Sequence, residues 1–304
     1  TYQINDFFQS ITPKINTLFG YDNALKKVTD YYQKNKGENT TNEYTNIFKG
    51  KNIIAIHAES MQTNAMELTF NDEEVTPNLN KLAKEGIFFS NFYAEVGVGT
   101  SSDTEFTLNT SLMPSNSGTV FVSYYDRTYE TMPKLLKQKG YYAFSMHGNV
   151  GDFWNRLEMH KSLGYDKFYH KDYYKIDETI GFSGTGLSDK SFFKQSVPII
   201  KKVSEQENKP FYATLITLSN HTPWDDLDLM DKFPTDYKIK TKSGIVSRTY
   251  LEGTTMGNYF RSVHYADQAI GQFIEELDKS KENSEKFATS GLIVPARKDA
   301  ANSK

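Results

Sequence analysis

The chain has 304 residues, a formal net charge of −3 and no cysteine. This length can bury a substantial hydrophobic core, and a single α/β domain of this size is ordinary. The absence of cysteine excludes disulfides and cysteine-ligated zinc sites, and the net charge gives no reason to expect a nucleic acid partner. The sequence contains no apolar run long enough to span a bilayer.

The N-terminal part of the sequence predicts a helical connector followed by a linker. Residues 1–35 carry apolar side chains at helical spacing, interrupted by Pro13 and Gly20. Residues 35–45 are polar and contain Gly and Asn, as expected of a linker. The predicted divisions of the chain are residues 1–50 as connector and linker, residues 51–279 as the main domain, and residues 280–304 as a polar, flexible tail.

Helices and strands are predicted to alternate along the main domain. Two of the helices begin with a threonine and a proline in the first turn and end at a glycine, a common capping pattern. Short apolar runs that end in polar residues are typical of buried parallel strands. This alternation predicts an α/β fold with a mostly parallel sheet flanked by helices on both faces. The predicted helices cover residues 76–86, 131–140 and 259–277, and the predicted strands cover residues 51–59, 141–146 and 211–218.

The segment VGTSSDTEF, residues 98–106, carries adjacent hydroxyls and two carboxylates in one turn. It lies downstream of a strand that ends at Glu59, where α/β enzymes place their chemistry. A hydroxyl needs a base or a metal ion to act as a nucleophile, and no Gly-x-Ser-x-Gly motif surrounds the segment. A metal-activated hydroxyl nucleophile is one interpretation. The other is a helix N-terminus capped by Ser101 or Ser102.

Six separate sequence blocks between residues 50 and 280 occur in the same order as in one known protein family. They are residues 52–62 (NIIAIHAESMQ), 75–82 (VTPNLNKL), 99–106 (GTSSDTEF), 146–169 (MHGNVGDFWNRLEMHKSLGYDKFY), 186–193 (GLSDKSFF) and 211–224 (FYATLITLSNHTPW). Together they resemble the lipoteichoic acid synthase family, the polyglycerol-phosphate synthases of the alkaline phosphatase/sulfatase-like superfamily. The resemblance implies a sulfatase-like fold, with residues 51–279 as its incomplete catalytic domain.

The resemblance implies a metal-dependent phosphoglycerol transferase that works in two half-reactions. A hydroxyl takes glycerol phosphate from phosphatidylglycerol, with diacylglycerol as the leaving group, and passes it to a growing lipoteichoic acid chain or a glycolipid acceptor. The family nucleophile is a threonine directly before a Ser-Asp pair, and this alignment puts Ser101 in its place, with Thr100 as the fallback. Serine supports the same chemistry. Glu59 and Ser101 match the metal ligands, and the implied metal is Mn²⁺, with Mg²⁺ as the alternative.

The resemblance also implies a pocket for the glycerol phosphate group. His147, Trp154 and Arg156 fit the family pattern His-Gly-x-x-x-x-Phe-Trp-Asn-Arg, and arginine offers a planar fork to phosphate oxygens. Asn149 stands where the family often has aspartate. His221 matches the histidine that contacts substrate and assists proton transfer to the leaving group. Without the resemblance, Trp154 reads as a core aromatic and Arg156 as a solvated charge. The remaining histidines read as structural or surface residues: His57, His160, His170 and His264.

One family feature is missing from this sequence. The family completes its metal site with an Asp-His pair at the end of a late strand, and the sequence contains no Asp-His dipeptide. Three explanations are open: a C-terminally truncated synthase, a short member that binds glycerophosphate without catalysis, or partial replacement of the ligands by Asp299 and its neighbours. The first ranks highest and the last ranks lowest, because the tail around Asp299 reads as solvated.

The resemblance further implies a setting at the cell envelope. Family members are membrane proteins of Gram-positive bacteria, so we expect an ectodomain on the extracellular face of the cell membrane, joined to a membrane portion that would precede Thr1. The weaker alternative is another phosphotransferase or hydrolase of the superfamily. It lacks support, because no cysteine is present to become a sulfatase formylglycine or to form the disulfides of typical phosphoethanolamine transferases.

Overall fold

The computed structural model describes residue 20 and residues 23–37, 40–180, 186–230, 233–235, 237–248, 251–281 and 289–295. The chain divides into two compact units, Thr1–Lys49 and Gly50–Lys304. In the first unit residues 23–34 form a helix, whereas the predicted connector residues 1–19 lie outside the described part.

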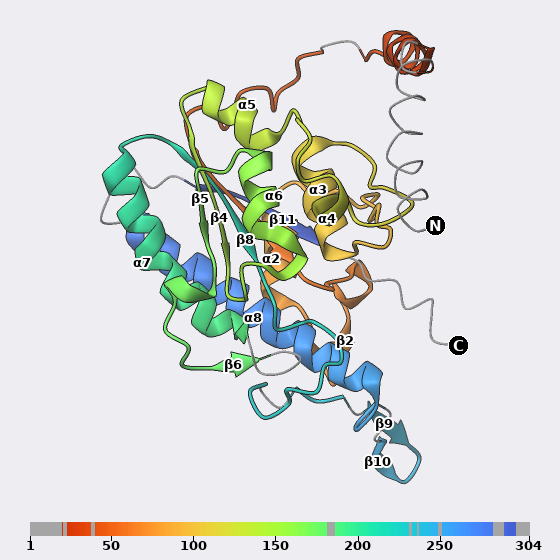
Figure 1. Ribbon diagram of the computed structural model, residues 1–304. Coiled ribbons are helices and arrows are strands. Elements are labelled where there is room, and N and C mark those ends of the chain that lie inside the picture. Colours follow the sequence, from red (N-terminus) through yellow and green to blue (C-terminus); the bar gives the residue numbers. More distant parts are fainter. Residues whose placement is uncertain are drawn as a thin grey trace, which may run out of the picture. The chain divides into compact units, whose positions relative to one another are not determined.

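A five-stranded sheet forms the centre of the second unit, in the order β11-β1-β8-β4-β5 (Figure 1). Every neighbouring pair in it is parallel, which confirms the predicted α/β class. The strands are β1 (Asn52–Ala58), β4 (Tyr142–His147), β5 (Lys167–Tyr169), β8 (Phe211–Ile216) and β11 (Thr289–Pro295). Short two-stranded sheets pair β2 (Thr69–Phe70) with β3 (Glu73–Glu74), β6 (Thr179–Ile180) with β7 (Gly186–Leu187), and β9 (Tyr237–Thr241) with β10 (Gly244–Arg248).

The helices cover both faces of the central sheet. Its central strands are buried on both sides and alternate their side chains between two hydrophobic clusters. Ile54 and Ile56 pack in the larger cluster with helices α2, α7 and α8, whereas Ala55 packs in the smaller one with α3, α4 and α6 (Figure 1). The helices are α2 (Pro77–Glu85), α3 (Ser101–Thr110), α4 (Val120–Ser123), α5 (Met132–Gln138), α6 (Arg156–Leu163), α7 (Asp189–Glu207) and α8 (Thr255–Lys281), with 3-10 turns η1 (Thr63–Ala65), η2 (Phe153–Asn155) and η3 (Lys171–Tyr173).

The C-terminal part of the chain adds a strand to the central sheet. Within the expected polar tail, residues 280–304, the structure forms strand β11 beside β1. The physical reason is the apolar run Gly291–Val294, which can extend a sheet although polar residues surround it. The division of the second unit into a catalytic domain and a tail stays a prediction.

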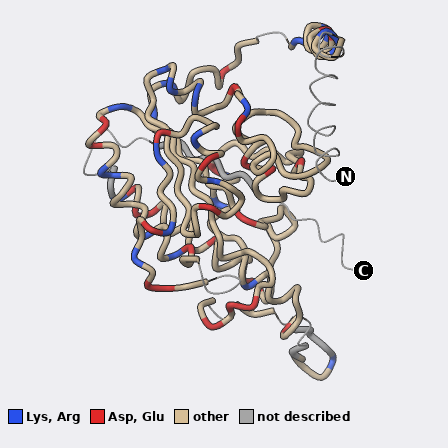
Figure 2. Tube along the Cα trace, viewed as in Figure 1, with Lys and Arg blue, Asp and Glu red and all other residues tan. Residues whose placement is uncertain are grey.

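Charge is spread over the described chain. Figure 2 shows acidic and basic residues interspersed along the trace, in keeping with the net charge of −3. Within the described residues, none of the helices is both long enough and apolar enough to cross a membrane.

Candidate active site

A pocket with a volume of about 470 Å³ collects side chains from the carboxyl ends of three neighbouring strands. Glu59 directly follows β1, His147 ends β4, and His221 comes shortly after β8. Parallel strands bring these ends to one edge of the sheet, which is where α/β folds bind ligands. The lining brings together seven of the predicted site residues: Glu59, Ser101, His147, Asn149, Trp154, Arg156 and His221. Thr100 is not part of the lining.

The hydroxyl of Ser101 is hydrogen-bonded to the carboxylate of Glu59. Ser101 Oγ donates to Glu59 Oε2 at 2.6 Å, and Ser60 Oγ donates to Oε1 at 2.9 Å. Glu59 is 5% exposed, and its backbone N–H donates to Thr217 Oγ1 at 2.8 Å. Oxygen atoms of Ser101 and Glu59 therefore converge in the pocket, in a position that the strand order fixes.

A tight turn before α3 places Ser101 at the first position of the helix. The backbone N–H groups of Gly97 and Gly99 donate to Asp103 Oδ2 at 2.8 and 2.9 Å. A side chain at Gly99 would collide with that carboxylate, so glycine is needed there. Thr100 has φ of 44°, a conformation that costs energy for a β-branched residue and recurs at functional sites.

The alternative of a simple helix cap is not what the structure shows. The N-cap position belongs to Thr100, which makes no side-chain capping bond. Ser102 Oγ donates to the carbonyl of Gly99 at 2.8 Å, and Ser101 Oγ donates to Glu59. A hydroxyl that caps a helix would accept from a backbone N–H instead, so neither serine caps α3 through its side chain.

Two histidines each use Nδ1 to bind a backbone carbonyl. His147 Nδ1 lies 2.9 Å from the oxygen of Ile216, and His221 Nδ1 lies 2.6 Å from the oxygen of Thr222. A carbonyl oxygen can only accept, so Nδ1 carries a proton in both rings and Nε2 is left for other partners. Burial, together with the nearby Arg156 charge, lowers the pKa of His147 to about 3. His147 is therefore neutral near pH 7.

A strained turn places Trp154 and Arg156 in the pocket. Trp154 and Asn155 have φ of 59° and 56° at the junction between η2 and α6. Asn155 Nδ2 donates to the carbonyl of Phe121 at 2.8 Å, which anchors this turn to α4. Trp154 both packs against the smaller cluster and lines the pocket. Arg156 is buried, so the interpretation of a solvated charge is wrong for it.

Sequence reasoning gave Glu105 no role in the site. Glu105 is buried on α3, and its Oε1 accepts hydrogen bonds from Arg156 Nε at 2.9 Å and Nη2 at 2.7 Å. Its Oε2 lies 3.0 Å from Nε2 of His160, which the sequence marked only as structural or surface. The available signal was the spacing of four residues from Ser101, which puts Glu105 on the same helix face.

Asp189 is a second buried carboxylate that the sequence did not reveal. It opens α7, and its two oxygens accept from the backbone N–H groups of Leu218 at 2.7 Å and Ser219 at 3.1 Å. Burial raises the pKa of Asp189 to about 6, although these hydrogen bonds lower it in part. Asp189 thereby fixes the start of the loop that carries His221.

The sulfatase family profile matches residues 51–286. The chain belongs to the sulfatase family. Lipoteichoic acid synthase 2 of Bacillus subtilis (strain 168) is 36% identical over 280 residues, which cover 91% of this chain and 40% of that protein. Lipoteichoic acid synthase of Staphylococcus aureus (strain USA300) is 34% identical over 282 residues, with 91% and 41% covered. These similarities confirm the resemblance predicted from the sequence.

Solved structures support the fold of this sulfatase family member. The crystal structure of the lipoteichoic acid synthase LtaP from Listeria monocytogenes matches with a TM-score of 0.76 and 29% identity, over 90% of this chain and 62% of that one. A structure of the phosphoglycerol transferase GacH of Streptococcus pyogenes shares the fold, with a TM-score of 0.53 and 19% identity, over 84% of this chain and 62% of that one. The chain spans about two fifths of the length of the curated relatives it matches.

Sulfatase-like proteins are generally metal-dependent. Glu59 and Ser101 offer converging hard oxygen donors, which suit Mn²⁺ or Mg²⁺. Within the part of the chain that the structure describes, no three His, Cys, Asp or Glu side chains cluster as a metal site would require. Asp299, the predicted substitute ligand, lies outside the described residues.

Proposed function

We propose that this chain transfers glycerol phosphate from phosphatidylglycerol to a growing lipoteichoic acid chain through a covalent intermediate on Ser101. One observation carries the proposal: the Ser101 hydroxyl is bonded at 2.6 Å to a buried carboxylate, in a pocket that also contains a buried arginine. The similarity to lipoteichoic acid synthases supports the choice of substrate class. The proposal makes Ser101, and not Thr100, the nucleophile.

In the first half-reaction Ser101 Oγ attacks the phosphorus of the lipid headgroup. The new bond is Oγ–P, and the bond that breaks joins phosphorus to the oxygen of diacylglycerol. The Ser101 proton passes toward Glu59 Oε2, which already accepts it in a hydrogen bond. A proton delivered from Nε2 of His221 neutralises the diacylglycerol oxygen, which makes His221 the general acid of this step.

In the second half-reaction a hydroxyl at the end of the acceptor chain attacks the same phosphorus. The acceptor forms a new O–P bond, the Oγ–P bond breaks, and Ser101 Oγ recovers from Glu59 the proton that it gave up in the first half-reaction. His221 can now take the proton from the acceptor hydroxyl, which reverses its first role. The two steps leave the enzyme unchanged and lengthen the polymer by one glycerol phosphate.

The remaining pocket residues bind and orient the glycerol phosphate group. Arg156 supplies charge-assisted N–H donors to the phosphoryl oxygens. His147, Asn149 and Trp154 border the space around them, and the neutral His147 presents Nε2 as an acceptor for a glycerol hydroxyl. A divalent cation held by Glu59 and Ser101 would supply Lewis acid stabilisation of the developing charge.

A binding module without turnover is the second candidate. It is favoured by the absence of a three-ligand metal cluster among the described residues. Such a module would hold a glycerophosphate group through Arg156 and His147 without transferring it. We place both candidates on the extracellular face of a Gram-positive cell membrane, with phosphatidylglycerol and a glycerol phosphate polymer or glycolipid as partners, because the similar synthases act in lipoteichoic acid synthesis.

A turnover assay separates the two candidates. The chain is incubated with phosphatidylglycerol vesicles and Mn²⁺, and released diacylglycerol is measured. We expect release by the parent protein and by T100V, and loss of about 1000-fold or more in S101A, because the nucleophile is missing. Glycerophosphate binding without diacylglycerol release would favour the binding module. Equal activity of S101A and the parent would refute the assignment of Ser101.

A further inference from the structure

Glu105 connects the helix that bears Ser101 to the side chain of Arg156. Its Oε1 accepts from two nitrogens of one guanidinium, Nε at 2.9 Å and Nη2 at 2.7 Å. Both side chains are 3% exposed, so water does not screen this ion pair. Glu105 follows Ser101 by four residues on α3, which puts both on one helix face. Helix α3 thus carries the Ser101 hydroxyl and, through Glu105, also holds the guanidinium of Arg156.

We propose that Glu105 is a positioning residue that fixes the guanidinium of Arg156 relative to Ser101 for the phosphate group of the substrate. The inference rests on the proposed function and deepens it. A guanidinium has five N–H groups in a planar fork. Glu105 occupies the edge formed by Nε and Nη2, while Nη1 makes a longer contact with the carbonyl of Phe153 at 3.4 Å. These three contacts use three of the five N–H groups, which leaves two for phosphate oxygens, and Arg156 lines the pocket.

A second hydrogen-bond chain holds the other oxygen of Glu105. His160 Nε2 lies 3.0 Å from Oε2, and His160 Nδ1 lies 2.8 Å from Ser145 Oγ. Burial lowers the pKa of His160, so the ring is neutral near pH 7. Its proton is on Nε2, which donates to the carboxylate, and Nδ1 accepts from the Ser145 hydroxyl. Both oxygens of Glu105 are therefore directed by hydrogen bonds.

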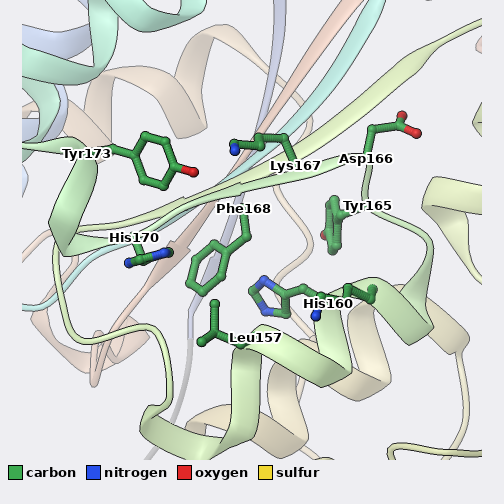
Figure 3. Close-up of a pocket in the computed structure, with 9 residues that line it drawn as sticks. Leu157, His160, Tyr165, Asp166, Lys167, Phe168, His170 and Tyr173 are labelled. Carbon is green, nitrogen blue, oxygen red and sulfur yellow. The ribbon is translucent and has the colours of Figure 1, made fainter.

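Packing also fixes the ring of His160. Figure 3 shows the ring between Leu157, Tyr165 and Phe168, at the wall of a separate cavity of about 220 Å³. The ring centroids of His160 and Phe168 are 4.5 Å apart, and those of His160 and Tyr165 are 5.3 Å apart. The aromatic neighbours restrict the rotation of His160, and this keeps Nε2 directed at Glu105.

The charge state suits a positioning role. Burial raises the pKa of Glu105, but the charge of Arg156 and the hydrogen bond from His160 more than offset this, so its pKa lies far below the usual range. Glu105 therefore stays ionised. An ionised partner keeps Arg156 in one orientation without proton exchange during turnover.

A double-mutant cycle over E105Q and R156Q tests the inference. Diacylglycerol release from phosphatidylglycerol vesicles gives kcat and KM, and calorimetry gives the affinity for sn-glycerol 1-phosphate. We expect E105Q alone to lower kcat by about 100-fold, because a misplaced binding group costs this much. Its KM should stay within about threefold of the parent value, because the phosphate still meets an arginine. In the R156Q background, the same E105Q change should alter kcat by less than about threefold.

The contrary result is that E105Q lowers kcat by the same factor in the parent protein and in the R156Q background. That result, or an unchanged kcat in E105Q, overturns the positioning role. D267N is the matched control, because Asp267 is a buried carboxylate that binds the backbone of Asn78 and Leu79 at the start of α2. It should keep the parent kcat even if its unfolding temperature falls.

Two measures keep the inference falsifiable. Unfolding temperatures of all four proteins show whether each folds, and E105D replaces E105Q if the latter does not fold. If the parent protein binds sn-glycerol 1-phosphate but releases no diacylglycerol, the proposed transfer fails, and the cycle is then measured on this affinity. Additive losses of affinity would overturn the inference, and a parent protein that binds no glycerol phosphate would overturn both.

Discussion

At the scale of single residues, several pocket side chains use some of their polar atoms to bind the protein and leave others for a ligand. His147 and His221 each bind a backbone carbonyl through Nδ1 and keep Nε2 for other partners. Arg156 binds Glu105 through Nε and Nη2 and keeps further N–H groups. Such partial use fixes each side chain while leaving it a ligand-binding atom. The site is therefore organised before substrate arrives.

Protonation of His147 should contribute to acid unfolding. Its pKa is about 3 in the folded protein, against an ordinary value of 6.5 for histidine, so the unfolded chain binds this proton more tightly. Its contribution to the free energy of unfolding is present above pH 6.5 and is lost as pH falls toward 3, at about 1.4 kcal/mol per pH unit. Between pH 7 and pH 4, the free energy of unfolding measured with denaturant should fall less steeply in H147N than in the parent protein. The asparagine side chain of H147N would retain a donor for the carbonyl of Ile216. Equal slopes in both proteins would contradict this account.

Single residues were predictable where the chemistry leaves a local signature. The family pattern selected Ser101 over Thr100, and the structure brings Ser101 into the pocket lining. Glu105 and Asp189 escaped prediction, because their partners are about 51 and 29 residues away in sequence and only the fold brings them together. A carboxylate in a helical segment gives no indication of its distant partner.

At the element scale, the N-terminus of α3 determines where the proposed nucleophile lies. The N–H groups of Gly97 and Gly99 hold the Asp103 carboxylate, and Thr100 takes a strained backbone conformation beside it. Helices predicted from capping patterns were found within one or two residues, as α2 shows. Only Gly291–Val294 reads as strand-like in the polar C-terminal stretch, and strand β11 contains these four residues.

Replacing Gly99 with alanine should disturb this turn. A Cβ at Gly99 would meet the Asp103 carboxylate and the Ser102 hydroxyl, so the loop must shift. We expect G99A to reduce the free energy of unfolding by about 1–3 kcal/mol and to lower kcat for diacylglycerol release. G37A is the matched control, since a Cβ there meets nothing within 4 Å. A G99A protein with the stability and kcat of the parent would show that the turn does not hold Ser101.

At the scale of the whole molecule, one parallel sheet separates two hydrophobic clusters and presents the pocket at its edge. The fold class was predictable from alternating helices and strands, and the sheet order was not, because strand neighbours depend on long-range pairing. Phe144 is fully buried in the larger cluster and contacts the rings of Phe211 and Tyr169. The pocket depends on this core, because β4 carries both Phe144 and His147.

Truncation of Phe144 should therefore destabilise the second unit. We expect F144A to lower the free energy of unfolding by about 3–5 kcal/mol, because it leaves a cavity in a packed core. Y93A, which shortens an aromatic side chain that is 70% exposed, should change it by less than about 0.5 kcal/mol. Denaturant titration followed by circular dichroism measures both. Equal effects of the two variants would contradict the assignment of the core.

The most direct test of the central claim is mass spectrometry of the Ser101 peptide after the chain meets phosphatidylglycerol and Mn²⁺ without an acceptor. The account predicts a glycerophosphoryl group on Ser101 of the parent protein. The same group should form more slowly in H221A, because His221 protonates the leaving group, and it should be absent in S101A. A modified peptide in S101A, or turnover by the parent protein without any modification of Ser101, would contradict the covalent mechanism.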